Sequence, residues 1–165
     1  FCEMVKGANN IYCIGWGISS LVMELMQIRL TVMGCRALLC RRGGLSLWEQ
    51  VRSVREGDIV IVCELPSYAV EVTESVEIAH RNGAKVITMT DSAAAPVCRF
   101  AELQINVSAN SPTFGSSIIG PIFLTHVLTS SLAVSLGDEA KKSFDEQAQF
   151  LHDERIFHPI FGLKY

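Results

Sequence analysis

The sequence predicts an α/β fold, a three-layer αβα sandwich in which a five-stranded parallel sheet lies between two layers of helices. Five short apolar runs alternate with longer segments whose apolar residues recur at helical spacing. The run Ile59 to Cys63 is apolar at every position, which is typical of a strand buried on both faces of a parallel sheet. The expected strand order is the flavodoxin-like 2-1-3-4-5, in which the winding direction reverses between the first and third strands.

The composition is that of one packed domain covering residues 1–165. Hydrophobic residues make up 49% of the chain and charged residues 19%, which argues against disorder. The net charge of -3 gives no electrostatic footprint for nucleic acid. No uninterrupted apolar run reaches the ~18 residues of a membrane span, and no signal peptide opens the chain. We therefore expect a cytoplasmic protein without a membrane partner.

A glycine turn links the first predicted strand to the first long helix within Ile11 to Ser20. Gly15 and Gly17 can adopt backbone angles closed to other residues, and they let a ligand approach the main chain. Ser19 or Ser20 is placed to cap the helix that follows. Backbone amides at the start of that helix would face an anion, so this turn is the first candidate binding loop.

The helix after this turn, residues 18–33, is apolar around most of its circumference. We expect the sheet to cover one side of it and a partner subunit to cover the other. The second strand follows at Arg36 to Cys40. The next helix is expected to bury Leu45, Trp48 and Val51.

The third strand leads into a second loop, Glu64 to Tyr68, and the fourth strand, Lys85 to Thr90, leads into a third loop, Thr90-Asp91-Ser92. Ligands of such sheets bind in the crevice outside the carboxyl ends of the strands, where the winding reverses. We therefore expect the first two loops to form a site, with the third beside them. The remaining expected elements are a short helical stretch at 96–102, a strand at 103–107, and helices at 116–136 and 138–153.

Each of these motifs also has a plain structural interpretation as polar or glycine turn chemistry. Arg41-Arg42 after the second strand would suit the 2'-phosphate of a nicotinamide cofactor, but a solvated turn is the simpler interpretation. The four histidines are scattered and the six cysteines show no CxxC spacing. We therefore expect neither a metal site nor a cofactor.

The chain resembles the sugar isomerase (SIS) domain, most closely the version that forms the C-terminal half of RpiR-type transcriptional regulators. The resemblance covers nearly all of the sequence, residues 8–155. It rests on segments that match the family's two binding loops and the strands around them: Ile14-Gly15-Trp16-Gly17-Ile18-Ser19, Gly57-Asp58-Ile59-Val60-Ile61, Leu65-Pro66-Ser67-Tyr68, Asn82-Gly83-Ala84-Lys85-Val86-Ile87 and Thr90-Asp91-Ser92, followed by Pro96, Pro112, Phe114 and Ser116.

This resemblance implies a domain that binds sugar phosphates or related carbohydrate derivatives and forms a homodimer or higher oligomer. In the regulators a separate N-terminal helix-turn-helix domain binds DNA, and a chain that opens at Phe1 without an initiator methionine fits such a domain upstream. No catalytic residue is expected. The expected ligand-binding residues are Gly15, Gly17, Ser19, Ser20, Glu64, Ser67, Tyr68, Thr90 and Ser92.

The second loop departs from the family pattern. Where the family places serine and threonine hydroxyls around a phosphate, this chain carries Glu64, Pro66 and Ala69, and Ser67 is the nearby hydroxyl. An ionised Glu64 would repel a phosphate by about 4 kcal/mol per charge pair at ~4 Å. Either Glu64 points away from the ligand, or the ligand is not a simple phosphosugar and offers an amino or hydroxyl group to Glu64.

The leading hypothesis is a non-catalytic effector domain of a bacterial transcriptional regulator of carbohydrate metabolism. An aldose-ketose isomerase on the same fold is the rival, with Glu64, Glu71 and His152 as the available bases. An oligomerisation module whose pocket has decayed is the third interpretation.

Overall fold

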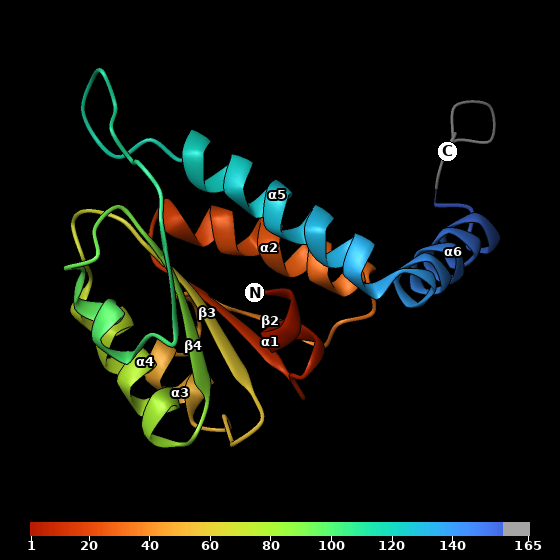
Figure 1. Ribbon diagram of the computed structural model, residues 1–165, viewed down its shortest axis with the longest axis horizontal. Helices are drawn as coiled ribbons and strands as arrows, with labels where there is room; N and C mark the ends of the chain where they lie inside the picture. Colours follow the sequence, from red (N-terminus) through yellow and green to blue (C-terminus); the bar gives the residue numbers. More distant parts are fainter. Residues whose placement is uncertain (157–165) are drawn as a thin grey trace.

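The computed structural model describes residues 1–156 and contains one five-stranded parallel sheet (Figure 1). Its order is β2-β1-β3-β4-β5, and every pair of neighbouring strands is parallel. The predicted fold class and strand order are therefore confirmed. The strands are β1 (Ile11–Gly15), β2 (Ala37–Cys40), β3 (Ile59–Glu64), β4 (Lys85–Thr90) and β5 (Leu103–Asn106).

Helices cover both faces of this sheet (Figure 1). One layer holds α1 (Cys2–Lys6), α2 (Ser19–Val32) and α5 (Ile119–Leu136). The opposite layer holds α3 (Leu47–Val51), α4 (Val70–Arg81) and the 3-10 helix η1 (Pro96–Phe100). A last helix, α6 (Asp138–Asp153), follows α5 and extends beyond the sheet (Figure 1).

The strands supply both layers of the core because successive side chains of a strand point to opposite faces. In β3, Ile59, Ile61 and Cys63 belong to the cluster under α2 and α5. Val60 and Val62 belong to the cluster under α3 and α4. All five side chains are buried, which explains why this stretch of sequence is apolar without alternation.

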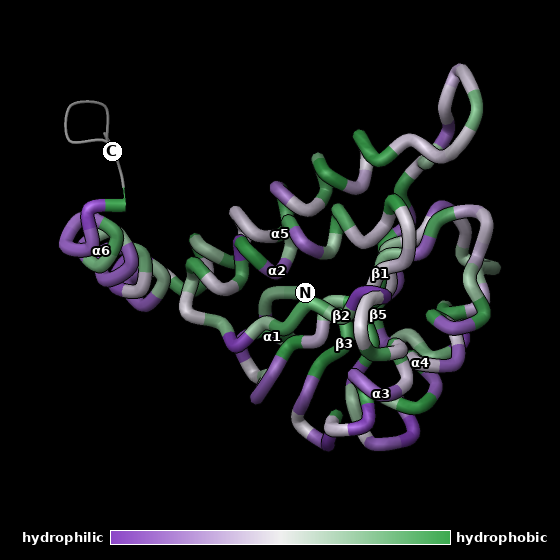
Figure 2. Tube along the Cα trace, turned by 180° about the vertical axis from the view of Figure 1, so that it is seen from behind, coloured by the Kyte–Doolittle hydropathy of each residue, from purple (hydrophilic) through white to green (hydrophobic). Residues whose placement is uncertain are grey.

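Helix α5 of the same chain covers part of α2, a cover that was not predicted from the sequence. The two helices lie side by side in both views (Figures 1 and 2), and the Arg29 Nε atom donates to Thr129 Oγ1 at 2.6 Å. Leu21 and Ile28 of α2 are still 55% and 50% exposed, so contact of this helix with a partner subunit stays a prediction.

Helix α5 is itself long and apolar enough to cross a membrane by length and composition, with a mean hydropathy of 1.6 over 18 residues. The sequence shows no uninterrupted apolar run there because Thr125, His126 and Thr129 interrupt it. The two threonine hydroxyls donate to backbone carbonyls one turn earlier, which satisfies them within the helix. Only 22% of the helix window is buried, so much of an apolar helix faces outward.

The core face of α3 differs from the predicted one. Leu47 and Val51 are buried, whereas Leu45 and Trp48 are 54% and 43% exposed. Ser46 caps the helix and forms a reciprocal capping box with Glu49, so the helix begins at Leu47. Counting the helical period from Leu45 therefore placed the wrong residues inward.

A buried carboxylate fixes the amino end of β3 against the start of β1. Asp58 is 3% exposed, and its Oδ1 accepts from the backbone and side-chain nitrogens of Asn10 at 3.1 and 2.8 Å. Its Oδ2 accepts from the backbone amide of Arg55 at 2.9 Å. These contacts hold the two adjacent strands at the end opposite to the predicted binding loops.

We expect Asp58→Ala to lower the free energy of unfolding by about 2–4 kcal/mol, because it leaves buried donors without their charged acceptor. Urea denaturation followed by circular dichroism measures this change. Asp145→Ala, which removes an exposed carboxylate on α6, is the matched control and should stay within about 0.5 kcal/mol of the wild type. Equal effects of the two substitutions would contradict the role given to Asp58.

Candidate functional site

The three predicted loops meet at the carboxyl edge of the sheet. In the register of the central strands, Gly15 of β1 lies beside Cys63 of β3, and Glu64 lies beside Thr90 of β4. The loop after β1, the loop after β3 and the loop after β4 are therefore consecutive neighbours. This is the arrangement that the strand order requires at the reversal of winding.

The first loop turns so tightly that it needs its glycines. A Cβ atom on Gly15 would lie 2.7 Å from the Ser19 carbonyl oxygen, and Gly17 has a φ of 57°, in the left-handed region. The start of α2 therefore approaches the end of β1 directly. An alanine at position 15 would push these two segments apart.

The predicted capping of α2 by Ser19 or Ser20 is wrong. The N-cap is Ile18, which makes no side-chain cap bond, and both serines lie inside the first helical turn. From there the Ser20 hydroxyl donates to the Gly17 carbonyl at 2.7 Å. Ser19 is buried, beside the Cys63 thiol.

The second loop is built around the carboxylate of Glu64, which is 3% exposed. Its Oε1 accepts from the backbone amide of Ala69, the N-cap of α4, at 2.9 Å. Its Oε2 is buried and makes no hydrogen bond within the described residues 1–156. Burial raises the pKa of this carboxyl to about 7, although the Ala69 amide favours the ionised form. The Glu64 carboxylate therefore points toward the start of α4.

Hydrogen bonds join the second loop to its neighbours. The Tyr68 hydroxyl donates to Asp91 Oδ1 at 2.9 Å, which connects it to the third loop. The Ser116 hydroxyl donates to the Pro66 carbonyl oxygen at 2.8 Å, which connects it to the segment before α5. These bonds fix the position of the loop that carries Glu64.

The structure brings the nine predicted ligand residues to one edge but gives them different exposure. Ser19, Glu64 and Thr90 are buried, and the Thr90 hydroxyl donates to the Ser92 carbonyl at 2.9 Å. Ser67 is exposed. The part that each residue plays in ligand binding stays a prediction.

The three residues considered as isomerase bases do not form one constellation. Glu71 accepts from the Leu47 amide at 2.9 Å. His152 is exposed on α6. That helix packs near the far end of α2, where the Ser143 hydroxyl donates to the Val32 carbonyl at 3.0 Å. Glu64 is therefore the one of the three that lies within the loops.

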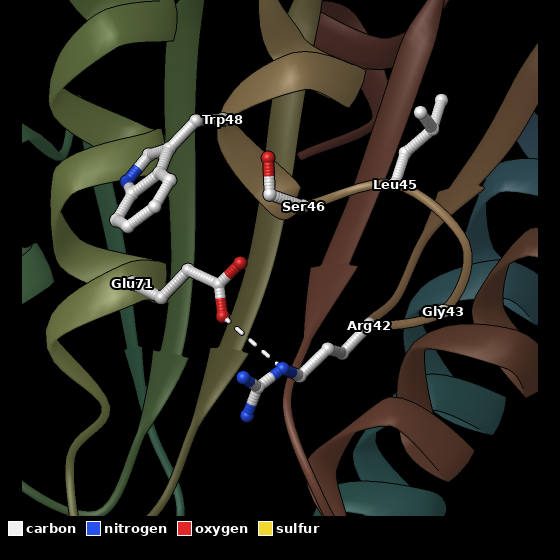
Figure 3. A pocket seen from close by; sticks show the side chains of 6 residues that line it. All are labelled: Arg42, Gly43, Leu45, Ser46, Trp48 and Glu71. Carbon is white, nitrogen blue, oxygen red and sulfur yellow. Dashed lines mark ion pairs between the residues drawn. The ribbon is translucent and has the colours of Figure 1, made fainter.

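A hollow of about 280 Å³ lies next to these loops and was not predicted from the sequence (Figure 3). The Arg42 guanidinium reaches across it to the Glu71 carboxylate, with Nε and Oε2 3.8 Å apart. Leu45 and Trp48 line it because they face outward, whereas the helical period assigned them to the core. Within residues 1–156 no group of three or more His, Cys, Asp or Glu side chains is placed to hold a metal ion.

The family model of the SIS domain matches residues 4–135. The chain belongs to the SIS domain family. An uncharacterized HTH-type transcriptional regulator of Haemophilus influenzae is 22% identical over 158 residues, which is 93% of this chain and 54% of that protein. The chain therefore spans about half the length of this curated relative.

Two solved structures share the fold. The sugar isomerase domain of an RpiR transcription factor from Sphaerobacter thermophilus superposes with a TM-score of 0.84 at 22% identity, covering 90% of this chain and 83% of that one. The Vibrio vulnificus NanR protein complexed with ManNAc-6P gives a TM-score of 0.78 at 24% identity, covering 92% and 58%. The family expected from the sequence is confirmed.

The pKa of Glu64 makes the stability of this SIS domain depend on pH. In the folded state burial keeps the carboxyl protonated up to about pH 7, whereas the pKa of an unperturbed glutamate is about 4.5. Between these values the unfolded state binds fewer protons, so stability falls as pH rises and levels off above the folded pKa. We expect ionisation of this carboxyl to lower the free energy of unfolding by about 1–3 kcal/mol between pH 4.5 and 7.5.

Urea denaturation of wild type and Glu64→Gln at several pH values measures the effect, since the amide cannot titrate. The stability of the wild type relative to Glu64→Gln should decline over this interval. Glu74→Gln, which removes an exposed carboxylate from α4, should follow the wild type. If the difference in stability between the wild type and Glu64→Gln did not change with pH, the raised pKa of Glu64 would be contradicted.

Proposed function

We propose that this SIS domain is the effector domain of a bacterial RpiR-type transcriptional regulator. It binds a carbohydrate derivative across the loops after β1 and β3, in the cytoplasm, and it modulates DNA binding by a separate helix-turn-helix domain upstream. The observation that carries the proposal is the tight first loop, in which the Gly15 backbone touches the start of α2 beside Glu64 and Thr90. The likeness to two regulator structures and to an HTH-type relative supports it.

The proposed ligand class is a sugar or amino sugar, phosphorylated or not. The NanR structure holds ManNAc-6P, a phosphorylated amino sugar, and its fold matches most of this chain. The first loop retains Ser19, a candidate partner for a ligand's phosphate or hydroxyl. The second loop carries Glu64, Pro66 and Ala69 in place of phosphate-binding hydroxyls, so it contributes to recognition in another way.

An isomerase is the second candidate function. Glu64 is buried at the loops with a pKa of about 7, a value suited to a general base near neutral pH. A sugar isomerase would move a proton between adjacent carbons of its substrate through this carboxyl. Turnover of a phosphosugar by the wild type, abolished in Glu64→Gln, would favour this function over the sensor.

The operator affinity of the full-length protein tests the sensor function. We expect one carbohydrate from a panel of sugars, amino sugars and their phosphates to change the affinity by about 5- to 150-fold, the usual range of coupling between two sites. Fluorescence anisotropy with labelled promoter DNA measures it. Ser19→Ala should reduce the response, and Ser53→Ala, on the other side of the sheet, should keep it. A response to no compound of the panel would contradict the sensor function.

We also propose a homodimer formed through the helix layer of α2 and α5. On α5 an exposed apolar stripe runs along one side at helical spacing, and its members are Ile119, Phe123, Val127 and Val134. Leu21 and Ile28 extend it onto α2, and both helices are coloured hydrophobic along much of their length in Figure 2. A contiguous apolar surface of this kind marks a protein or membrane contact.

We expect Phe123→Glu to raise the dissociation constant of the dimer by roughly 100-fold or more, since it would place a charge at the centre of the apolar contact in both copies. Analytical ultracentrifugation over a range of concentrations measures the constant. Trp48→Glu is the control, because Trp48 is also an exposed aromatic residue but lies on α3, in the opposite helix layer. A wild type that is monomeric at every concentration would rule out this dimer.

A further inference from the structure

The start of α4 already has an acidic group of the same chain bound to it, the carboxyl of Glu64, which is an anion above about pH 7. The helix is 12 residues long, and the Glu64 carboxylate accepts from the amide of its N-cap, Ala69, at 2.9 Å. The amino end of a helix favours negative charge because its first amides lack intrahelical partners. Glu64 therefore takes the position where a helix of this kind would hold a ligand's phosphate.

The other oxygen of the same carboxylate is unpartnered. Glu64 Oε2 makes no hydrogen bond within residues 1–156, although the side chain is 3% exposed. A buried carboxylate oxygen without a donor is costly, and native proteins seldom leave one unsatisfied. The arrangement supplies an acceptor that a ligand's hydroxyl or amino group would satisfy, and it supplies no donor there for a phosphate.

The arginines nearest to the loops do not offset the charge of Glu64. Arg41 pairs with Glu24 at 3.4 Å, and Arg42 faces Glu71 at 3.8 Å. Each of these cations is already opposite a carboxylate of its own. Neither of these two arginines is therefore available to offset the charge of Glu64 against a phosphate at the second loop.

We propose that the second loop of this site is specific for an unphosphorylated part of a carbohydrate, which donates a hydroxyl or amino hydrogen to Glu64 Oε2, and that it excludes phosphate. This proposal rests on the proposed function, because it assumes that the loops bind a carbohydrate. It names the ligand class of the same site. Specificity of this kind is strong because a ligand without the donor leaves the buried oxygen unpaired.

The test compares paired ligands that differ by one phosphate. Isothermal titration at pH 8 measures the affinity of the 165-residue chain for N-acetylmannosamine and its 6-phosphate, and for glucosamine and its 6-phosphate. Glu64→Ser removes the carboxylate and supplies a hydroxyl beside the helix start. Glu64→Gln keeps the shape of the side chain and an acceptor for the Ala69 amide. It is the variant to use if Glu64→Ser does not fold. Glu74→Ser removes an exposed carboxylate of α4 and is the matched control.

We expect the wild type to bind the unphosphorylated member of at least one pair more tightly by about 10- to 100-fold, the usual worth of a hydrogen bond to a charged group. Glu64→Ser should reverse this order, Glu64→Gln should lose the preference for glucosamine over its phosphate, and Glu74→Ser should behave as the wild type.

Tighter binding of the phosphorylated members by the wild type would overturn the proposed specificity and leave the carbohydrate-binding function intact. An order unchanged in folded Glu64→Ser and Glu64→Gln would also overturn it. Binding of none of the four compounds to any of the proteins would overturn both the specificity and the proposed function.

Discussion

Strand β1 pairs in parallel with β3, and this pairing decides where everything else at the site lies. At one end the buried carboxylate of Asp58 ties β3 to Asn10 before β1. At the other end the same register places Gly15 beside Cys63, one residue before Glu64. Because the helices after these strands pack on opposite faces of the sheet, the two loops diverge at this edge, which is where ligands of such sheets usually bind.

Glu64 connects the stability of this domain with its proposed function. A carboxyl group in that position lowers stability when it ionises, because burial removes it from water and one oxygen lacks a donor. Its other oxygen accepts from the N-cap amide of α4, so the group also orders the loop it belongs to. A binding site commonly retains such an unfavourable group when a ligand satisfies it.

The helix pair α2 and α5 links the site to the outside of the molecule. The first turn of α2 touches the end of β1 at Gly15, so a shift of the first loop would move this helix. Arg29 and Thr129 connect α2 to α5, whose apolar stripe faces outward. A ligand at the loops and a second copy on this surface would therefore act on the same rigid layer of helices.

The sequence alone determined the sheet order, because apolar runs separated by helical segments allow few arrangements of a parallel sheet. It also identified the family and the unusual Glu64 of the second loop. Only the tertiary structure decided which atoms meet: that α5 covers α2, that Leu45 and Trp48 face outward, and that Ser20 bonds to Gly17 without capping α2. Periodicity indicates that a helix has a buried face, but the identity of its cover depends on contacts between residues distant in the sequence, such as Arg29 and Thr129. The direction of the Glu64 carboxylate, toward the Ala69 amide, was also decided by the structure, and it supports the proposal of a donor-bearing ligand at the second loop.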